Sequence, residues 1–259
     1  MLCKICGHTT VEKVITSRAK YTKDKTLKCF ECTYCGYVNL PENIEKYDHY
    51  MSEDGFHIDF AQKRNGNEFR PGREYYMALT GTKIIGPDNL EVSFFGPGYN
   101  IDHEWYKNKY PQSTVKLVDL ENYQNFENYE HPEKCSPSDL VIASEVIEHF
   151  TNPEDNFKNL FSAVKKDGLI ICSTNINDGS ELAKHDYPFT AGHCSYWSPI
   201  SLIKIASQFG FFVDFRTPEI AVKRAGKRKK YIFFFKDVSV MLRIGAYFAI
   251  NIYAESEKE

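Results

Sequence analysis

The sequence predicts an α/β fold with a mostly parallel, doubly wound sheet, and two segments carry this prediction. In the first, residues 138–175, short apolar runs at 140–143 and 169–172 flank an amphipathic stretch. Strand, helix and strand at this spacing form a βαβ unit of a parallel sheet. In the second, residues 90–109, an apolar run precedes the glycine turn GPGYN and a short helical stretch at 101–109. A glycine turn between a strand and a helix is typical of the ligand-binding edge of such a sheet.

The helix between the two apolar runs has clear start signals. Thr151 or Asn152 can cap it, Pro153 fits its first position, and two acidic residues complement its dipole. Gly168 is expected to end the helix. Apolar residues recur in between at i, i+3, i+4 and i+7: Phe157, Leu160, Phe161 and Val164.

The remaining strands are expected at 113–118, 211–216 and 249–254. Few residues separate Asp119 from Asp139, so the helical layer between the second and fourth strands must be cut short. The basic run 223–230 and the aromatic run 231–235 predict an exposed insert between the last two strands. Its helix is expected to pack inward through Phe234, Val238 and Leu242. Alternatively, the basic run binds anionic lipid, a nucleic-acid backbone or a phosphorylated acceptor.

Composition limits the class of protein. A chain of 259 residues can hold one α/β domain and a small appendage. The formal net charge is −3, which disfavours nucleic acid as a partner. No run approaches the ~18 apolar residues of a membrane span, and residues 1–10 do not resemble a signal peptide. Eight cysteines then indicate metal ligands and free thiols rather than disulfides, and we expect a cytoplasmic protein.

Two CxxCG turns mark a zinc site at the amino terminus. Cys3 and Cys6 form the first pair, and Cys32 and Cys35 form the second. Four thiolates on two tight turns suit tetrahedral Zn²⁺, and a site without an open position is structural. Cys29 is a competing ligand, because it also forms a CxxC pair with Cys32. The repeated glycine after each pair favours Cys32 and Cys35.

The string SEVIEHF, followed by NPE, a helix, KKDG and a strand, resembles the class I S-adenosylmethionine-dependent methyltransferases. The subgroup it is most similar to is the bacterial small-molecule and sugar methyltransferases. The resemblance covers residues 70–259 and, more loosely, the cysteine segment. It implies a Rossmann-like sheet of seven strands in a methyltransferase domain at 84–259. A zinc-ribbon-like module at 1–45 and a linker with a cap helix at 46–83, aromatic at Tyr47, Tyr50 and Phe56, would precede it.

The resemblance also implies S-adenosylmethionine as cofactor, held by the glycine loop. Gly96 permits the sharp turn, Pro97 follows it, and Gly98 lets the backbone approach the methionine part closely. Asp119 ends the second strand, about twenty residues further on, where a carboxylate accepts hydrogen bonds from ribose hydroxyls. A plain turn and a plain strand end are the structural alternatives.

This chain departs from the family at two positions of the loop. Phe94 stands where the family has an acidic residue, and Asn100 stands where it has a third glycine, although Asn can adopt a left-handed conformation. Contacts to the methionine amine are therefore expected from elsewhere, either from Asp102 or from a backbone carbonyl. Residues 125–127 are candidates to flank the adenine.

Candidate catalytic residues follow the fourth and fifth strands. Ser144 and Glu145 end the fourth strand and are expected to contact the cofactor. Glu145, His149 and His193 are the catalytic candidates, because a hydroxyl acceptor must lose a proton and histidine titrates near neutrality. His149 has an alternative role in holding neighbouring loops. His193 belongs to a polar and aromatic loop expected to form a substrate wall with Asp178, His185, Asp186, Tyr187, Tyr196 and Trp197.

Three functions stay open at this point. The preferred one is methylation of a small molecule, either a sugar, a nucleotide-sugar or another surface-polysaccharide precursor. A phosphorylated or nucleotide-linked acceptor would carry negative charge that complements the basic run. The second is an rRNA base methyltransferase whose basic zinc module, with six Lys and Arg between residues 13 and 28, binds RNA. The third is a scaffold that keeps the fold without catalysis, for which Phe94 and the shortened middle are the best evidence.

Overall fold

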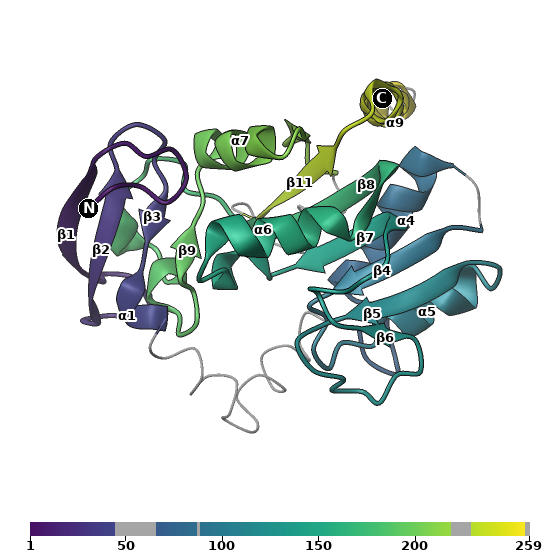
Figure 1. Ribbon diagram of the computed structural model, residues 1–259, viewed down its shortest axis with the longest axis horizontal. Coiled ribbons are helices and arrows are strands. Elements are labelled where there is room, and N and C mark those ends of the chain that lie inside the picture. Colours follow the sequence, from purple (N-terminus) through teal and green to yellow (C-terminus); the bar gives the residue numbers. More distant parts are fainter. Residues whose placement is uncertain (45–65, 87–88, 219–228, 257–259) are drawn as a thin grey trace.

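The computed structural model describes residues 1–44, 66–86, 89–218 and 229–256. A seven-stranded sheet forms the centre of the molecule (Figure 1), in the order β10-β11-β8-β7-β4-β5-β6. The strands β6, β5, β4, β7 and β8 run parallel, whereas β11 is antiparallel to both of its neighbours. The predicted seven-stranded, mostly parallel sheet is therefore confirmed. Its strands are β4 (Glu91–Phe95), β5 (Thr114–Val118), β6 (Tyr129–Glu130), β7 (Ser138–Ser144), β8 (Val164–Asn175), β10 (Phe212–Asp214) and β11 (Lys229–Phe235).

Helices cover both faces of this sheet. On one face, α4 (Arg73–Ile85), α5 (Asp102–Lys109) and α9 (Val238–Ser256) pack on alternate residues of the strands, among them Leu140 and Ile142. On the other, α6 (Pro153–Ser162) and α7 (Pro199–Gln208) pack on the intervening residues, such as Val141. Both faces of the central strands are thus buried, which explains their continuous apolar runs.

Gly168 has a different role from the one predicted. The helix α6 ends at Ser162, and both Val164 and Gly168 lie in β8. A side chain at position 168 would place its Cβ 2.7 Å from the carbonyl oxygen of Asp139. The pairing of β7 with β8 is irregular at this point, between Ser138 and Leu140. The glycine therefore allows two strands to approach closely at a bulge instead of ending a helix.

The prediction for the last strand was wrong. Residues 249–254 lie in α9, and the seventh strand is β11, which was assigned to an exposed insert. Its run KKYIFFF is buried between β8 and β10, as expected for a strand covered on both faces. Val240 and Ile244 of α9 face the core, whereas Val238 and Leu242 are exposed. Residues 223–228 of the basic run lie outside the described residues, and Lys229 is buried.

The shortened layer between β5 and β7 is confirmed. Residues 119–137 contain the two-residue strand β6 and turns, without a helix. The other short elements are α1 (Pro41–Ile44) and three 3₁₀ turns at Ile147–His149, Leu182–Lys184 and Tyr187–Phe189. Within the described part of the chain, no helix has both the length and the apolar composition needed to cross a bilayer.

A second, four-stranded sheet forms the amino-terminal module. Its order is β1-β2-β3-β9, from β1 (Thr10–Thr16), β2 (Thr26–Cys32), β3 (Val38–Asn39) and β9 (Ser195–Tyr196). Figure 1 shows β9, coloured green, next to the purple strands of this module. The last strand of the sheet thus comes from the loop after β8, so the module beginning at residue 1 is completed by the carboxyl half of the chain.

Candidate functional site

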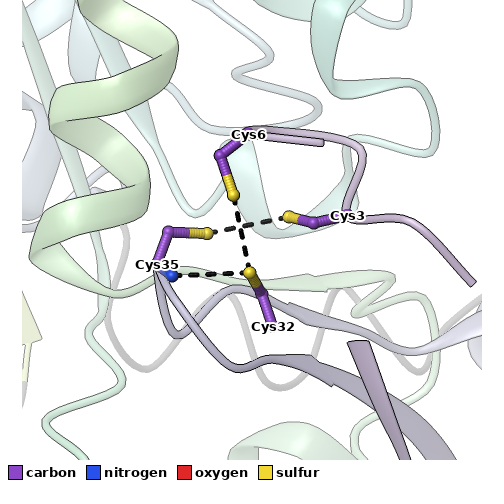
Figure 2. A group of neighbouring side chains, drawn as sticks. All are labelled: Cys3, Cys6, Cys32 and Cys35. Carbon is purple, nitrogen blue, oxygen red and sulfur yellow. Dashed lines mark hydrogen bonds between the residues drawn. The ribbon is translucent and has the colours of Figure 1, made fainter. Parts of the chain in front are cut away.

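The four predicted zinc ligands come together at the open end of the hairpin formed by β1 and β2 (Figure 2). The Cys3 and Cys35 sulfurs are 3.6 Å apart, and those of Cys6 and Cys32 are 3.5 Å apart. A tetrahedral site with Zn–S bonds of about 2.3 Å requires sulfur–sulfur distances of about 3.8 Å. The four thiols could therefore hold a zinc ion with little movement.

Each CxxCG turn has the geometry of a metal-binding knuckle. The amides of Ile5 and Cys35 donate to the sulfurs of Cys3 and Cys32, both at 3.4 Å. Gly7 and Gly36 have φ of 71° and 67°, a conformation that suits glycine. Cys29 lies outside the cluster, because its side chain is buried in a separate apolar group with Leu27 and Val38.

The glycine loop lies where the strand order reverses, since β4 has β5 on one side and β7 on the other. Gly96 and Gly98 both have positive φ, of 66° and 54°. A Cβ at Gly96 would contact Val146 at 2.7 Å, whereas one at Gly98 would point into open space. Ligands of doubly wound sheets bind at this reversal point, so the loop could hold a cofactor at Gly98.

Asp119 directly follows β5 and lies beside this loop. One of its carboxylate oxygens accepts from the Gly98 amide at 2.9 Å, and the other accepts from the Leu120 amide at 2.8 Å. Burial raises the pKa of the Asp119 carboxyl, and these two amides oppose the rise. Each carboxylate oxygen has a second lone pair for a ligand hydroxyl. Asn100 differs from the expectation, because its φ is not in the left-handed region.

Asp102 is used to position the start of α4. Its two oxygens accept from the amides of Gly72 at 2.6 Å and Glu74 at 2.9 Å, and the Asn100 side chain adds a third donor. Because Gly72 has no side chain to cap α4, a residue of α5 caps it instead. This contact fixes the orientation of Arg73 and Glu74, two buried charged residues in the first turn of α4.

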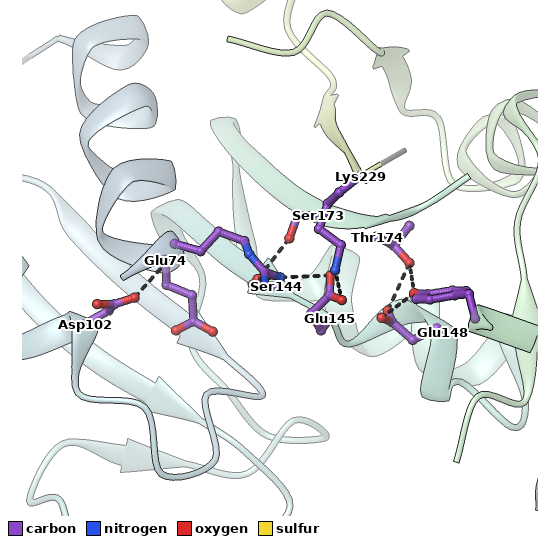
Figure 3. A network of polar contacts seen from close by, with 10 residues as sticks. Glu74, Asp102, Ser144, Glu145, Glu148, Ser173, Thr174 and Lys229 are labelled. Carbon is purple, nitrogen blue, oxygen red and sulfur yellow. Dashed lines mark hydrogen bonds and ion pairs between the residues drawn. The ribbon is translucent and has the colours of Figure 1, made fainter. Parts of the chain in front are cut away.

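Arg73 and Lys229 converge on Glu145 at the end of β7 (Figure 3). The Arg73 guanidinium lies 3.0 Å from one Glu145 oxygen and donates to the Ser144 hydroxyl at 3.1 Å. The Lys229 ammonium contacts the other Glu145 oxygen. Glu145 has φ of 58°, which is uncommon for a residue with a side chain and typical of strained functional sites. Two cations surround its single negative charge and stabilise the ionised carboxylate, so positioning suits Glu145 better than proton removal.

Glu148 forms a second buried network (Figure 3). The Tyr187 hydroxyl donates to one of its oxygens, and the Thr174 hydroxyl donates to the other at 3.2 Å. Burial raises the pKa of Glu148 to about 7, although both hydroxyls oppose the rise. The backbone carbonyl of Glu148 also accepts from the Cys194 amide at 2.8 Å. Glu148 therefore connects the end of β7 to the loop that carries His193.

The structure brings the two candidate histidines together. Their rings lie 5.1 Å apart, edge to face. His149 Nδ1 lies 2.8 Å from the Gly192 carbonyl, and His193 Nδ1 lies 2.8 Å from the Tyr187 carbonyl. A carbonyl can only accept, so both Nδ1 atoms carry hydrogen, and Nε2 is the basic nitrogen of each neutral ring. Burial, with a smaller contribution from His149, lowers the pKa of His193 well below its usual range.

The amino-terminal module holds the loop of His193 in place. Asn43 donates to the carbonyls of Pro188 and His193, both at 2.9 Å. Tyr37 shares a hydrogen bond of 2.7 Å with Ser195. The hydroxyl of Ser198 donates to the Cys35 carbonyl, next to the sulfur cluster. Of the predicted substrate wall, Asp186 faces the module, where it accepts from Tyr21 and Thr22.

Four charged residues of this region were not predicted from the sequence: Arg73, Glu74, Glu148 as a network member, and Lys229. Arg73 and Glu74 lie in a stretch assigned to the cap helix, and Lys229 belongs to the basic run 223–230, which was assigned to the surface. A signal was present at Lys229, because the aromatic run that follows it is long enough for a buried strand. Glu74 gave no signal, because single acidic residues are frequent in the first turns of helices.

Comparisons with known proteins agree with this architecture. A family model described as a methyltransferase domain matches residues 30–214. No curated protein matches the chain. The structure of the plantazolicin methyltransferase BpumL in complex with S-adenosylhomocysteine (SAH) has a TM-score of 0.54 and 7% identity, covering 76% of this chain and 95% of that chain. Coclaurine N-methyltransferase, bound to N-methylheliamine and SAH, has a TM-score of 0.47 and 15% identity, covering 75% and 86%.

The similarity to BpumL, at so low an identity, shows a shared fold. The family model gives evidence of family membership as well, because it matches most of the chain. The match extends from β2 to β10 and includes the glycine loop and both candidate histidines. The chain therefore belongs to the methyltransferase domain family.

Proposed function

We propose that this protein is an S-adenosylmethionine-dependent methyltransferase acting on a small molecule. The observation that carries the proposal is the pairing of Gly98 with Asp119 where the strand order reverses. An open glycine turn and a neighbouring carboxylate can accommodate, respectively, an amino-acid backbone and a pair of ribose hydroxyls. The SAH in the structure of BpumL, which shares the fold, supports the same cofactor here.

The residues of this chain supply binding, orientation and proton removal. Gly96 and Gly98 shape the loop for the methionine part, and Asp119 accepts from the ribose. Ser144 and Glu145, tied to Arg73, fix the end of β7 beside this site. When bound, the cofactor supplies an activated methyl group on a sulfonium.

The proton acceptor is His149 or His193. A hydroxyl acceptor must lose its proton as the new bond forms, and the Nε2 atom of a neutral imidazole can take it. His193 is held neutral by burial, while His149 is only partly buried and is therefore easier for an acceptor to reach. Because each ring is fixed through Nδ1 to a backbone carbonyl, the basic nitrogen has a defined direction.

We infer further that Cys3, Cys6, Cys32 and Cys35 bind one Zn²⁺. The donor set supports this inference, because four sulfurs near tetrahedral spacing leave no position for substrate. The ion would contribute to the stability of a short module whose described core is small. Its role in function is indirect, through the contacts of the module with the loop of His193.

The acceptor proposed is a sugar, a nucleotide-sugar or another surface-polysaccharide precursor. Two features support it: the resemblance to sugar methyltransferases that carry a cysteine cap, and an overall negative charge that disfavours nucleic acid. In this reading the basic residues of the module are a solvated surface, and several of them pair with neighbouring acids, as Lys13 does with Glu31.

Calorimetry with SAH followed by a substrate screen tests the proposal. The purified protein should bind SAH and should then add the mass of one methyl group to a member of a sugar or nucleotide-sugar pool. Absence of SAH binding would overturn the cofactor assignment. Binding without turnover on any pool would favour the non-catalytic scaffold, and methylation of ribosomal RNA alone would favour the RNA enzyme.

A further inference from the structure

The carboxyl end of β4, next to the glycine loop, has no acidic residue to contact the methionine amine. Phe94 occupies the relevant position, and its side chain is fully buried in the core, with its ring near those of His103 and Tyr106. Asp102, the first acidic residue after the glycine loop, already accepts from three donors, which belong to the start of α4 and to the loop. A positively charged ammonium at this site would therefore need another carboxylate.

Glu74 is a buried carboxylate with unused hydrogen-bonding capacity. It is only 5% exposed, and its Oε2 atom has no hydrogen-bond partner among the described residues. Figure 3 shows its carboxylate extending from the first turn of α4. A buried acceptor without a donor is costly, so such a group usually serves a ligand or a strained site.

The surroundings of Glu74 favour a cation. Burial and the neighbouring charge of Asp102 raise the pKa of Glu74 well above its usual range, while Arg73 lowers it and Asp119 adds a small rise. The side chain of Asn100, in the glycine loop, also lowers the pKa of Glu74 by hydrogen bonding. Glu74 thus adjoins the proposed cofactor loop, at a place where negative charge exceeds positive charge.

We propose that Glu74 accepts hydrogen bonds from the α-ammonium group of the cofactor's methionine part, in place of an acid at the carboxyl end of β4. This assignment rests on the proposed function, because it requires S-adenosylmethionine or SAH in the site. The capping of α4 by Asp102 aims the carboxylate, since the amide of Glu74 itself donates to Asp102. The ammonium supplies the donor that Oε2 lacks, and its charge offsets that of the two carboxylates.

Binding of three ligands tests the assignment without any need for turnover. The ligands are SAH, a deaminated SAH that retains the carboxylate, and 5′-methylthioadenosine, which lacks the whole amino-acid part. Glu74→Gln should weaken binding of SAH by about 10- to 100-fold, the range for a hydrogen bond between charged groups. Binding of the other two ligands should be unchanged. Glu104→Gln, the same substitution on the exposed surface of α5, is the matched control.

Thermal unfolding of the unliganded protein gives a second readout. Glu74→Gln should unfold at the same or a higher temperature than wild type, because it removes an ionisable group whose charged form is disfavoured by burial and by Asp102. A structural carboxylate would have the opposite effect. Equal binding of SAH by Glu74→Gln and wild type would overturn the assignment and leave the proposed function intact. Failure of wild type to bind SAH and 5′-methylthioadenosine would instead overturn the proposed function.

Discussion

Val38 of the amino-terminal module and Tyr196 of the loop after β8 are antiparallel strand partners. Their pairing joins the cysteine cluster to the segment that carries His193, three residues before Tyr196. The module is therefore not an independent appendage, because its fourth strand, β9, lies in the same loop as His193. Its stability should control the position of a candidate catalytic residue.

Removal of the Asn43 side chain should loosen the loop of His193. Asn43→Ala leaves the carbonyls of Pro188 and His193 without their donor, which costs about 1–3 kcal/mol for buried groups. We expect faster amide hydrogen exchange in residues 187–196 and unchanged binding of SAH. Asn108→Ala, on the exposed surface of α5, is the control. Unchanged exchange in the loop would show that the module does not hold it.

Metal analysis of cysteine variants tests the zinc site. Purified protein should contain one zinc per chain, and Cys32→Ser should lose it together with thermal stability, because the folding of such modules is coupled to metal binding. Cys29→Ala should keep the metal, because Cys29 is buried away from the cluster. Loss of zinc from Cys29→Ala with retention in Cys32→Ser would establish the alternative pair of ligands.

The parts of the fold that the sequence predicted well are those in which local signals agree with burial. The strand, glycine turn and helix around Gly96 and the strand ending at Ser144 were correct to within a residue or two. The helix before β8 was extended too far, because Val164 continues the helical spacing although it begins a strand. Gly168 fitted a helix end equally well, and only the approach of β7 explains it.

The missed features depend on contacts between distant segments. The strand β11 was hidden by the basic residues before it, one of which, Lys229, forms a buried ion pair with Glu145. The pairing of β3 with β9 joins segments more than 150 residues apart, which no local pattern can predict. The importance of Glu74 depends on two features of the folded chain: its Oε2 atom is buried without a hydrogen-bond donor among the described residues, and Asp102 already accepts from three donors.

Substitution of Gly98 should separate a cofactor effect from backbone strain. Gly98 and Gly210 both have positive φ, and a Cβ at either position would meet no atom within 4 Å. Gly98→Ala and Gly210→Ala should therefore lose similar stability, whereas only Gly98→Ala should weaken binding of SAH. Calorimetry and thermal unfolding measure the two effects. Equal affinity of both variants for SAH would remove Gly98 from the cofactor site.

Stability should depend on pH through Glu148. Its pKa is about 7 in the folded protein and near its usual 4.5 in the unfolded chain, so the stabilising contribution is full below pH 4.5 and is lost as pH rises through 7. The difference is about 3 kcal/mol in the free energy of unfolding. Glu148→Gln cannot titrate and should lack this dependence. Denaturant unfolding at a series of pH values checks it, and parallel pH curves for variant and wild type would contradict it.

Substitution of His149 and His193 tests which ring removes the proton. Each Ala variant keeps the glycine loop and Asp119 intact, so binding of SAH should be unchanged. Turnover should fall by about 10²–10⁴-fold in the variant that lacks the base, the usual contribution of a positioned base.

The other histidine variant should retain most of the rate, apart from the effect of a lost backbone hydrogen bond. His131→Ala, at a partly exposed histidine, is the control and should keep the wild-type rate. The pH profile adds a distinct readout. Because burial keeps His193 neutral well below pH 6.5, a rate that stays high under mildly acidic conditions would indicate His193 as the base. A rate that falls under these conditions would contradict His193 as the base. Wild-type turnover in both variants would show that alignment alone carries the reaction.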